Sequence, residues 1–66
     1  MKPIASLGLC NTASLNIYEF EYGINDYVIV GLNNEVPRKY KLYHNTKGAF
    51  FNWGKHRYYL GEFILI

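Results

Sequence analysis

The stretch 38–63 constrains the fold most, because its hydrophobicity alternates with period two and two turn signals divide it. In its first part, Tyr40 and Leu42 alternate with lysines, as in a strand that faces a core on one side and water on the other. The run Asn45-Thr46-Lys47-Gly48 and the pair Gly54-Lys55 both have the composition of turns. The stretch is therefore predicted to form a three-stranded meander.

Upstream of this meander, the pattern predicts two further strands. One begins at Ile17, where aromatic and polar residues alternate, and the other is the apolar run Tyr27–Leu32, which has no polar face and is expected to be buried on both sides or nearly so. Gly31 in that run indicates a bulge or a close backbone approach. Residues 1–16 form a poorly defined N-terminal segment, in which 5–9 could make a short strand and 11–14 a loop.

Together these segments predict a single all-β domain spanning residues 1–66. We expect a small five-stranded antiparallel meander, partly closed into an SH3-like or OB-like barrel, with a short helical turn near a terminus. An open sheet wrapped by its terminal segments is the alternative. The predicted core consists of Tyr27, Val28, Ile29, Val30, Tyr40, Leu42, Phe51, Trp53, Tyr58 and Leu60.

The size of the chain makes dense aromatic packing important. A domain of 66 residues has a small core and usually needs disulfides, a metal, a partner or tight packing. Cys10 is the only cysteine, so it forms no disulfide within the chain and fits a reducing bacterial cytoplasm. One Trp, seven Tyr and four Phe can supply the packing.

Several classes of function are disfavoured. Cys10, His44 and His56 lack the spacing of a structural zinc site, and nothing positions them as a catalytic group, so we expect a protein that is not an enzyme and uses no metal or cofactor. Leu7-Gly8-Leu9-Cys10 resembles a lipobox, but the run is short and Leu precedes the cysteine, so we expect no lipoprotein leader. No apolar run approaches the roughly 20 residues of a membrane span.

Charge is distributed unevenly along the chain. Residues 1–37 carry one base and four acids, which gives −3, whereas residues 38–66 carry six bases and one acid, which gives +5. Interleaved basic and aromatic side chains could bind a protein through Tyr and Arg hot spots, or could bind nucleic acid by phosphate contact and base stacking. A solvated sheet face is the plain alternative. The candidate binding residues are Lys39, Lys41, Tyr43, Lys47, Lys55, Arg57 and Tyr59.

The end of the sequence is apolar. The residues Phe63, Ile64, Leu65 and Ile66 are expected to form a homodimer interface, because a small sheet has little surface on which to bury them and its edge strands need covering. A monomer whose tail folds back over its own barrel is the alternative.

The run Arg38–Phe63, which ends in Tyr58-Tyr59-Leu60-Gly61-Glu62-Phe63, resembles short β-rich proteins of phages and mobile elements of Gram-positive bacteria. Several such proteins are stoichiometric inhibitors of bacterial immune systems, including CRISPR effectors. The resemblance implies a phage-type inhibitor that occludes a defence protein through its basic and aromatic sheet face. A nucleic-acid-binding SH3-like or OB-like module is the alternative.

Overall fold

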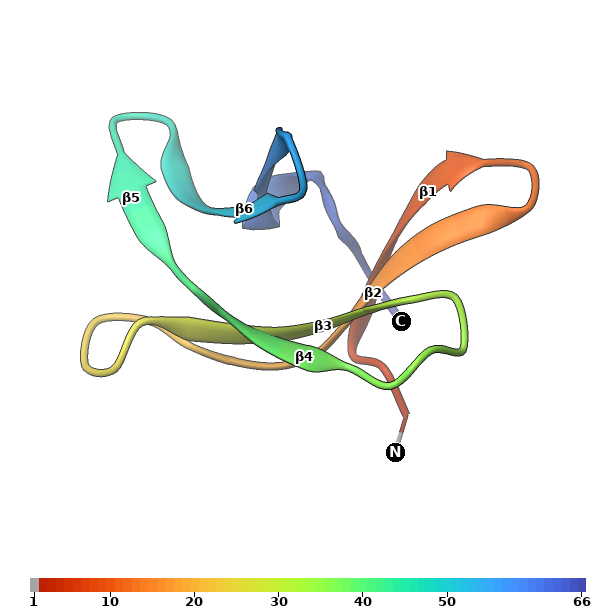
Figure 1. Cartoon of the computed structure of the whole chain (residues 1–66). Coiled ribbons are helices and arrows are strands. Elements are labelled where there is room, and N and C mark those ends of the chain that lie inside the picture. Colours follow the sequence, from red (N-terminus) through yellow and green to blue (C-terminus); the bar gives the residue numbers. More distant parts are fainter. Residues whose placement is uncertain (1) are drawn as a thin grey trace.

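The computed structural model describes residues 2–66, and most of these residues are in antiparallel strands (Figure 1). Met1, the first residue of the predicted N-terminal segment, lies outside the described residues. Within residues 2–66 the elements are β1 (Ala5–Cys10), β2 (Ala13–Glu21), β3 (Tyr27–Leu32), β4 (Arg38–Lys41), β5 (Tyr43–Asn45), β6 (Gly48–Trp53), β7 (His56–Tyr59), the 3-10 helix η1 (Leu60–Glu62) and β8 (Ile64–Leu65).

The strands form two sheets. One has five strands in the order β4-β3-β2-β1-β8, and the other has three in the order β5-β6-β7. Only Leu42 separates β4 from β5, and its side chain is buried, so one run of chain leaves the first sheet and enters the second. β8 pairs with β1, which brings both ends of the described chain together (Figure 1). Neither sheet formed by residues 2–66 closes on itself.

The all-β class and the antiparallel pairing are confirmed, but the predicted number of five strands is wrong. Residues 2–66 form eight strands for three reasons. The bend at Leu42 splits one predicted strand into β4 and β5. The segment 5–10 forms β1, which pairs with β2 with a shift of register between Gly8 and Cys10 and is followed by a tight turn at Asn11-Thr12. The apolar tail contributes β8, which gains its hydrogen bonds from β1.

One face of β3 packs into the core. Val28 and Val30 are buried, whereas Tyr27 and Ile29 are half-buried on the opposite face. Burial is therefore confirmed for the inner face of β3, whereas its outer face is half-buried. The close backbone approach predicted at Gly31 is confirmed, since a Cβ there would lie 3.0 Å from a carbonyl oxygen of the β3–β4 loop.

Phe51 lies at the centre of the core with 0% of its surface exposed. Its ring centroid lies 6.2 Å from that of Tyr40, and 6.0 Å from those of both Tyr58 and Phe63. These rings come from β4, β7 and the tail, so Phe51 joins the two sheets. The buried cluster consists of Ala5, Leu15, Ile17, Val28, Val30, Leu42, Phe51 and Phe63.

The predicted core is therefore confirmed in part. Tyr40, Trp53, Tyr58 and Leu60 are half-buried against the cluster rather than within it, and Tyr27 and Ile29 face away from it. The inward residues of β1 and β2 and the tail residue Phe63 were not predicted. They are buried because the inward side chains of β1 and β2 point to the same face of the five-stranded sheet as Val28 and Val30 of β3.

The helical turn predicted near a terminus is confirmed as η1. The Phe63 N–H donates to the Leu60 carbonyl at 3.1 Å, and the Tyr59 N–H donates to the Glu62 carboxylate at 2.9 Å. This turn directs Phe63 into the core, where it is 8% exposed. The assignment of Phe63 to an exposed dimer interface is thereby corrected, because its ring packs on Phe51.

Candidate binding surface

The outer face of the three-stranded sheet carries the main group of predicted binding residues. Phe51, Trp53 and Tyr58 point toward the core, so the residues that alternate with them point outward. Within residues 2–66, the outward positions of this sheet hold aromatic, amide and basic side chains and no carboxylate. We define the basic-aromatic surface as Lys41, Tyr43, Asn45, Lys47, Phe50, Arg57 and Tyr59.

Three rings form a ladder across this surface. Tyr43 of β5 pairs with Phe50 of β6, and Phe50 pairs with Tyr59 of β7. The ring centroids are 5.7 Å apart for the first pair, which is stacked at 23°, and 5.3 Å apart for the second. Cross-strand aromatic pairs of this kind stabilise a sheet and hold their rings in fixed positions. The ladder is therefore a rigid platform.

Two cations lie on this platform. The Arg57 guanidinium carbon is 4.3 Å from the Phe50 centroid, and the Lys41 ammonium is 5.4 Å from the Tyr43 centroid. Both distances are within the range of a cation–π interaction. Arg57 and the two tyrosines leave Phe50 only 7% exposed, whereas Tyr43 is 43% exposed. The surface thus presents positive charge from Arg57 and Lys41, and Tyr43 is the ring that is open to solvent.

Asn45 fixes the edge of the platform. Its amide nitrogen donates to the Tyr59 hydroxyl at 3.0 Å, and its amide oxygen accepts from the Lys47 backbone N–H at 2.8 Å. The hydrogen bond from Asn45, with hydrogen-bonding and positive charge from Arg57 and positive charge from Lys47, lowers the pKa of Tyr59, although desolvation opposes the shift. Both cations therefore favour the ionised form of the Tyr59 phenol.

Two of the predicted binding residues lie elsewhere. Lys39 places its ammonium 4.6 Å from the ring centroid of Tyr27, whose hydroxyl donates to Glu19. This hydrogen bond is the main reason why the pKa of Tyr27 is raised. Lys39 therefore belongs to a separate group with Tyr27 and Glu19, which includes the Glu19 carboxylate. Lys55 lies in the β6–β7 turn, at the opposite end of β6 from Lys47.

Phe50 and Asn45 were missing from the predicted site. Phe50 alternates with the core residue Phe51, so the period-two pattern places it outward. Asn45 was assigned to a turn, and the pairing of β5 with β6 and β7 is what brings it beside Tyr59. The register of the hairpins was the signal that could have identified both residues.

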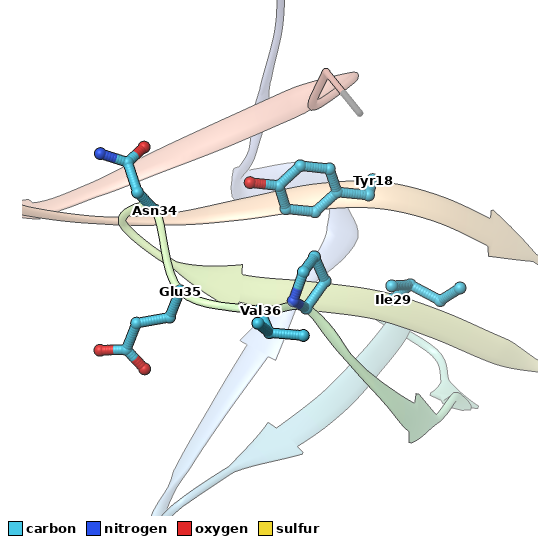
Figure 2. A pocket seen from close by; sticks show the side chains of 6 residues that line it. Tyr18, Ile29, Asn34, Glu35 and Val36 are labelled. Carbon is cyan, nitrogen blue, oxygen red and sulfur yellow. The ribbon is translucent and has the colours of Figure 1, made fainter.

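A second surface feature lies on the outer side of the five-stranded sheet. A shift of register between Ile17 and Glu19 makes Tyr18 a bulge residue. Figure 2 shows Tyr18 on β2 and Ile29 on β3 beside the loop that carries Val36. Tyr18, Ile29, Asn34, Glu35, Val36 and Pro37 line an open hollow of about 480 Å³. None of the predicted site residues lines this hollow.

The tail ends in three exposed side chains. Ile64, Leu65 and Ile66 are 75%, 81% and 77% exposed. The Ile66 N–H donates to the Ile4 carbonyl at 3.0 Å, which extends the pairing of β8 with β1. β8 is an edge strand, because its other side has no partner within residues 2–66. Of the four residues predicted to form a homodimer interface, these three are therefore the ones that are exposed.

The candidate metal ligands are held in separate places. His44 packs edge-on against Tyr22, with centroids 5.9 Å apart, and His56 lies 6.1 Å from Tyr58. The Cys10 thiol lies 3.6 Å from the Thr12 hydroxyl, and hydrogen bonding to Thr12 is the main reason why its pKa is lowered. Across residues 2–66, no three His, Cys, Asp or Glu side chains form a group that could hold a metal ion.

No helix within the described part of the chain is long and apolar enough to cross a membrane. Comparison of the chain with protein-family models, with curated proteins and with solved structures found no match.

Proposed function

We propose that this protein is a non-enzymatic binding protein that engages an anionic region of a protein partner through the basic-aromatic surface. One observation carries the proposal: within residues 2–66, the outer face of the three-stranded sheet joins a ladder of three rings to cations and contains no carboxylate. Tyr and Arg are the residue types enriched at protein–protein hot spots. On this face they are already fixed by stacking, which lowers the entropy lost on binding.

The geometry favours a protein over a nucleic acid as the main partner. Binding of successive bases needs several rings with an open face. Phe50 is covered by Arg57 and its neighbouring rings, so Tyr43 is the most accessible ring of the ladder. The overall charge of +2 is also small for a protein whose main task is to bind phosphates.

The resemblance of residues 38–63 to phage inhibitors supports a narrower proposal. The partner would be a bacterial defence protein, and binding would occlude one of its surfaces at a stoichiometry of one to one in the cytoplasm of the host cell. For the fold, we propose a partly closed barrel of the SH3-like or OB-like type. Two features support this: the bend at Leu42 that joins the sheets, and the return of β8 to β1.

The test compares the affinities of surface variants and of a control variant for a captured partner protein. The immobilised protein is used to capture proteins from a bacterial lysate, and the affinity of the purified partner is then measured by calorimetry. Arg57→Ala and Tyr43→Ala are each expected to weaken binding by roughly 30-fold, the effect of losing a hot spot of about 2 kcal/mol. Lys55→Ala, which removes an exposed cation at the opposite turn, is the control and should bind like the parent. Unchanged affinity in both surface variants overturns the proposal.

Single-stranded nucleic acid is the second candidate, because Tyr43 has an accessible ring beside the Lys41 ammonium. Fluorescence anisotropy with short labelled oligonucleotides tests it. If Lys41, Lys47 and Arg57 each neutralise one phosphate, the logarithm of the affinity falls with the logarithm of salt concentration with a slope of about −2. Binding without a salt slope, or no binding at low salt, rejects this candidate.

A further inference from the structure

Donors for hydrogen bonds gather around the hydroxyl of Tyr59. The Asn45 amide nitrogen donates to this hydroxyl from β5, two strands away, and the Asn45 amide oxygen accepts from the Lys47 backbone N–H, which fixes the amide in place. The residue of β6 opposite Asn45 is Gly48, which has no side chain to separate the two. Because the Tyr59 oxygen accepts the bond from Asn45, the hydroxyl proton is left to donate outward.

Two positively charged residues lie on the segments that surround Tyr59. Arg57 lies against Phe50, which pairs with Tyr59 across the strands. Lys47 is in the turn that Asn45 opens. The lowered pKa of Tyr59, to which both cations contribute, agrees with this arrangement. An anion placed here meets a hydroxyl and a guanidinium from β7 and an ammonium from the β5–β6 turn.

We propose that Tyr59, Arg57 and Lys47, positioned by Asn45, form a carboxylate-binding site that receives an acidic side chain of the protein partner. This inference rests on the function proposed above and names the group recognised there. An ionised carboxylate has about four positions that accept hydrogen bonds. The planar fork of an arginine can fill two, and the hydroxyl and the ammonium can fill one each. The adjoining ring ladder offers apolar contact for the stem of the acidic residue.

The test uses capped oligoglutamate, oligoglutamine with a free C-terminus, and inorganic phosphate as separate probes. Binding is followed by NMR at the Asn45 side-chain amide and by ultraviolet titration of the tyrosines. Capped oligoglutamate is expected to shift the Asn45 signals and to raise the pKa of Tyr59, because a nearby anion disfavours the phenolate. Tyr59→Phe and Arg57→Gln should each weaken this binding by roughly tenfold, as expected for loss of a hydrogen bond to a charged group. Lys55→Gln should leave it unchanged.

Three results overturn the site. Tighter binding of phosphate than of oligoglutamate rejects a carboxylate as the ligand. Binding of free-ended oligoglutamine alone assigns the site to a chain terminus instead of a side chain. An equal loss in Lys55→Gln and Arg57→Gln shows attraction by total charge only. The proposed function fails separately: it is lost if Tyr43→Ala and Arg57→Ala both keep full affinity for the partner, whereas full affinity in Tyr59→Phe with loss in Tyr43→Ala rejects the carboxylate site alone.

Discussion

Replacing Phe51 with alanine is expected to remove most of the stability of the fold. The side chain has no exposed surface and packs against rings from β4, β7 and the tail. A buried aromatic ring covers about 150–250 Å², which at roughly 25 cal/mol per Å² corresponds to about 4–6 kcal/mol. Measured Phe→Ala losses in cores are about 3–5 kcal/mol. A single core in a domain of this size supplies only about 3–5 kcal/mol in total.

Urea unfolding followed by circular dichroism measures this loss. The control is Phe20→Ala, which deletes the same side chain from a position that is about half exposed, and it should cost about 1 kcal/mol or less. Phe51→Ala should be unfolded or nearly so without urea. If both variants unfold within about 1 kcal/mol of the parent, the placement of Phe51 at the junction of the two sheets is wrong.

Three further outcomes are expected. In light scattering coupled to size exclusion, the chain should run as a dimer that Ile64→Asp with Ile66→Asp splits or unfolds, and a mass near 7.7 kDa at every dilution would contradict the dimer. Gly31→Ala should cost about 1–3 kcal/mol in urea unfolding, because its Cβ would crowd a backbone oxygen, whereas Gly8→Ala, where a Cβ meets nothing within 4 Å, should not. The raised pKa of Tyr27 means that its contribution to stability is complete below about pH 10 and is lost as the pH rises through the folded-state pKa. The stability difference between the parent and Tyr27→Phe should therefore shrink at alkaline pH, and a constant difference refutes this.

Local pattern was enough to predict the hairpins of the second half of the chain. Alternation placed Tyr43, Arg57 and Tyr59 on one outward face, and turn composition placed the turns at 45–48 and 54–55. It could not show that Lys39 lies over Tyr27 beside Glu19, because that group depends on the register between β4, β3 and β2. Which side chains lie beside each other on adjacent strands depends on how the strands pair, and the sequence of one strand alone does not determine that pairing.

The same limit explains the misplaced core residues. Trp53 was placed in the predicted core together with Phe51, but it lies next to the β6–β7 turn and is half-buried. Phe63 belongs to a run of four apolar residues in which nothing marks the first as different from the others. Its burial follows from the turn of η1, which directs Phe63 into the core while the three residues after it stay exposed. Likewise, no turn residue beside Tyr18 indicates the bulge there.

The pairing of β1 with β8 has a consequence for how the chain folds. It joins Ala5 to Leu65, which are separated by almost the whole sequence, whereas the β1–β2, β2–β3 and β6–β7 pairs are local hairpins. Closing so long a loop carries a larger entropy loss, and contacts of high sequence separation slow folding. We therefore expect the hairpins to form first and β8 to join last. Until it does, β1 is a sheet edge without a partner, which leaves it open to pairing with another chain.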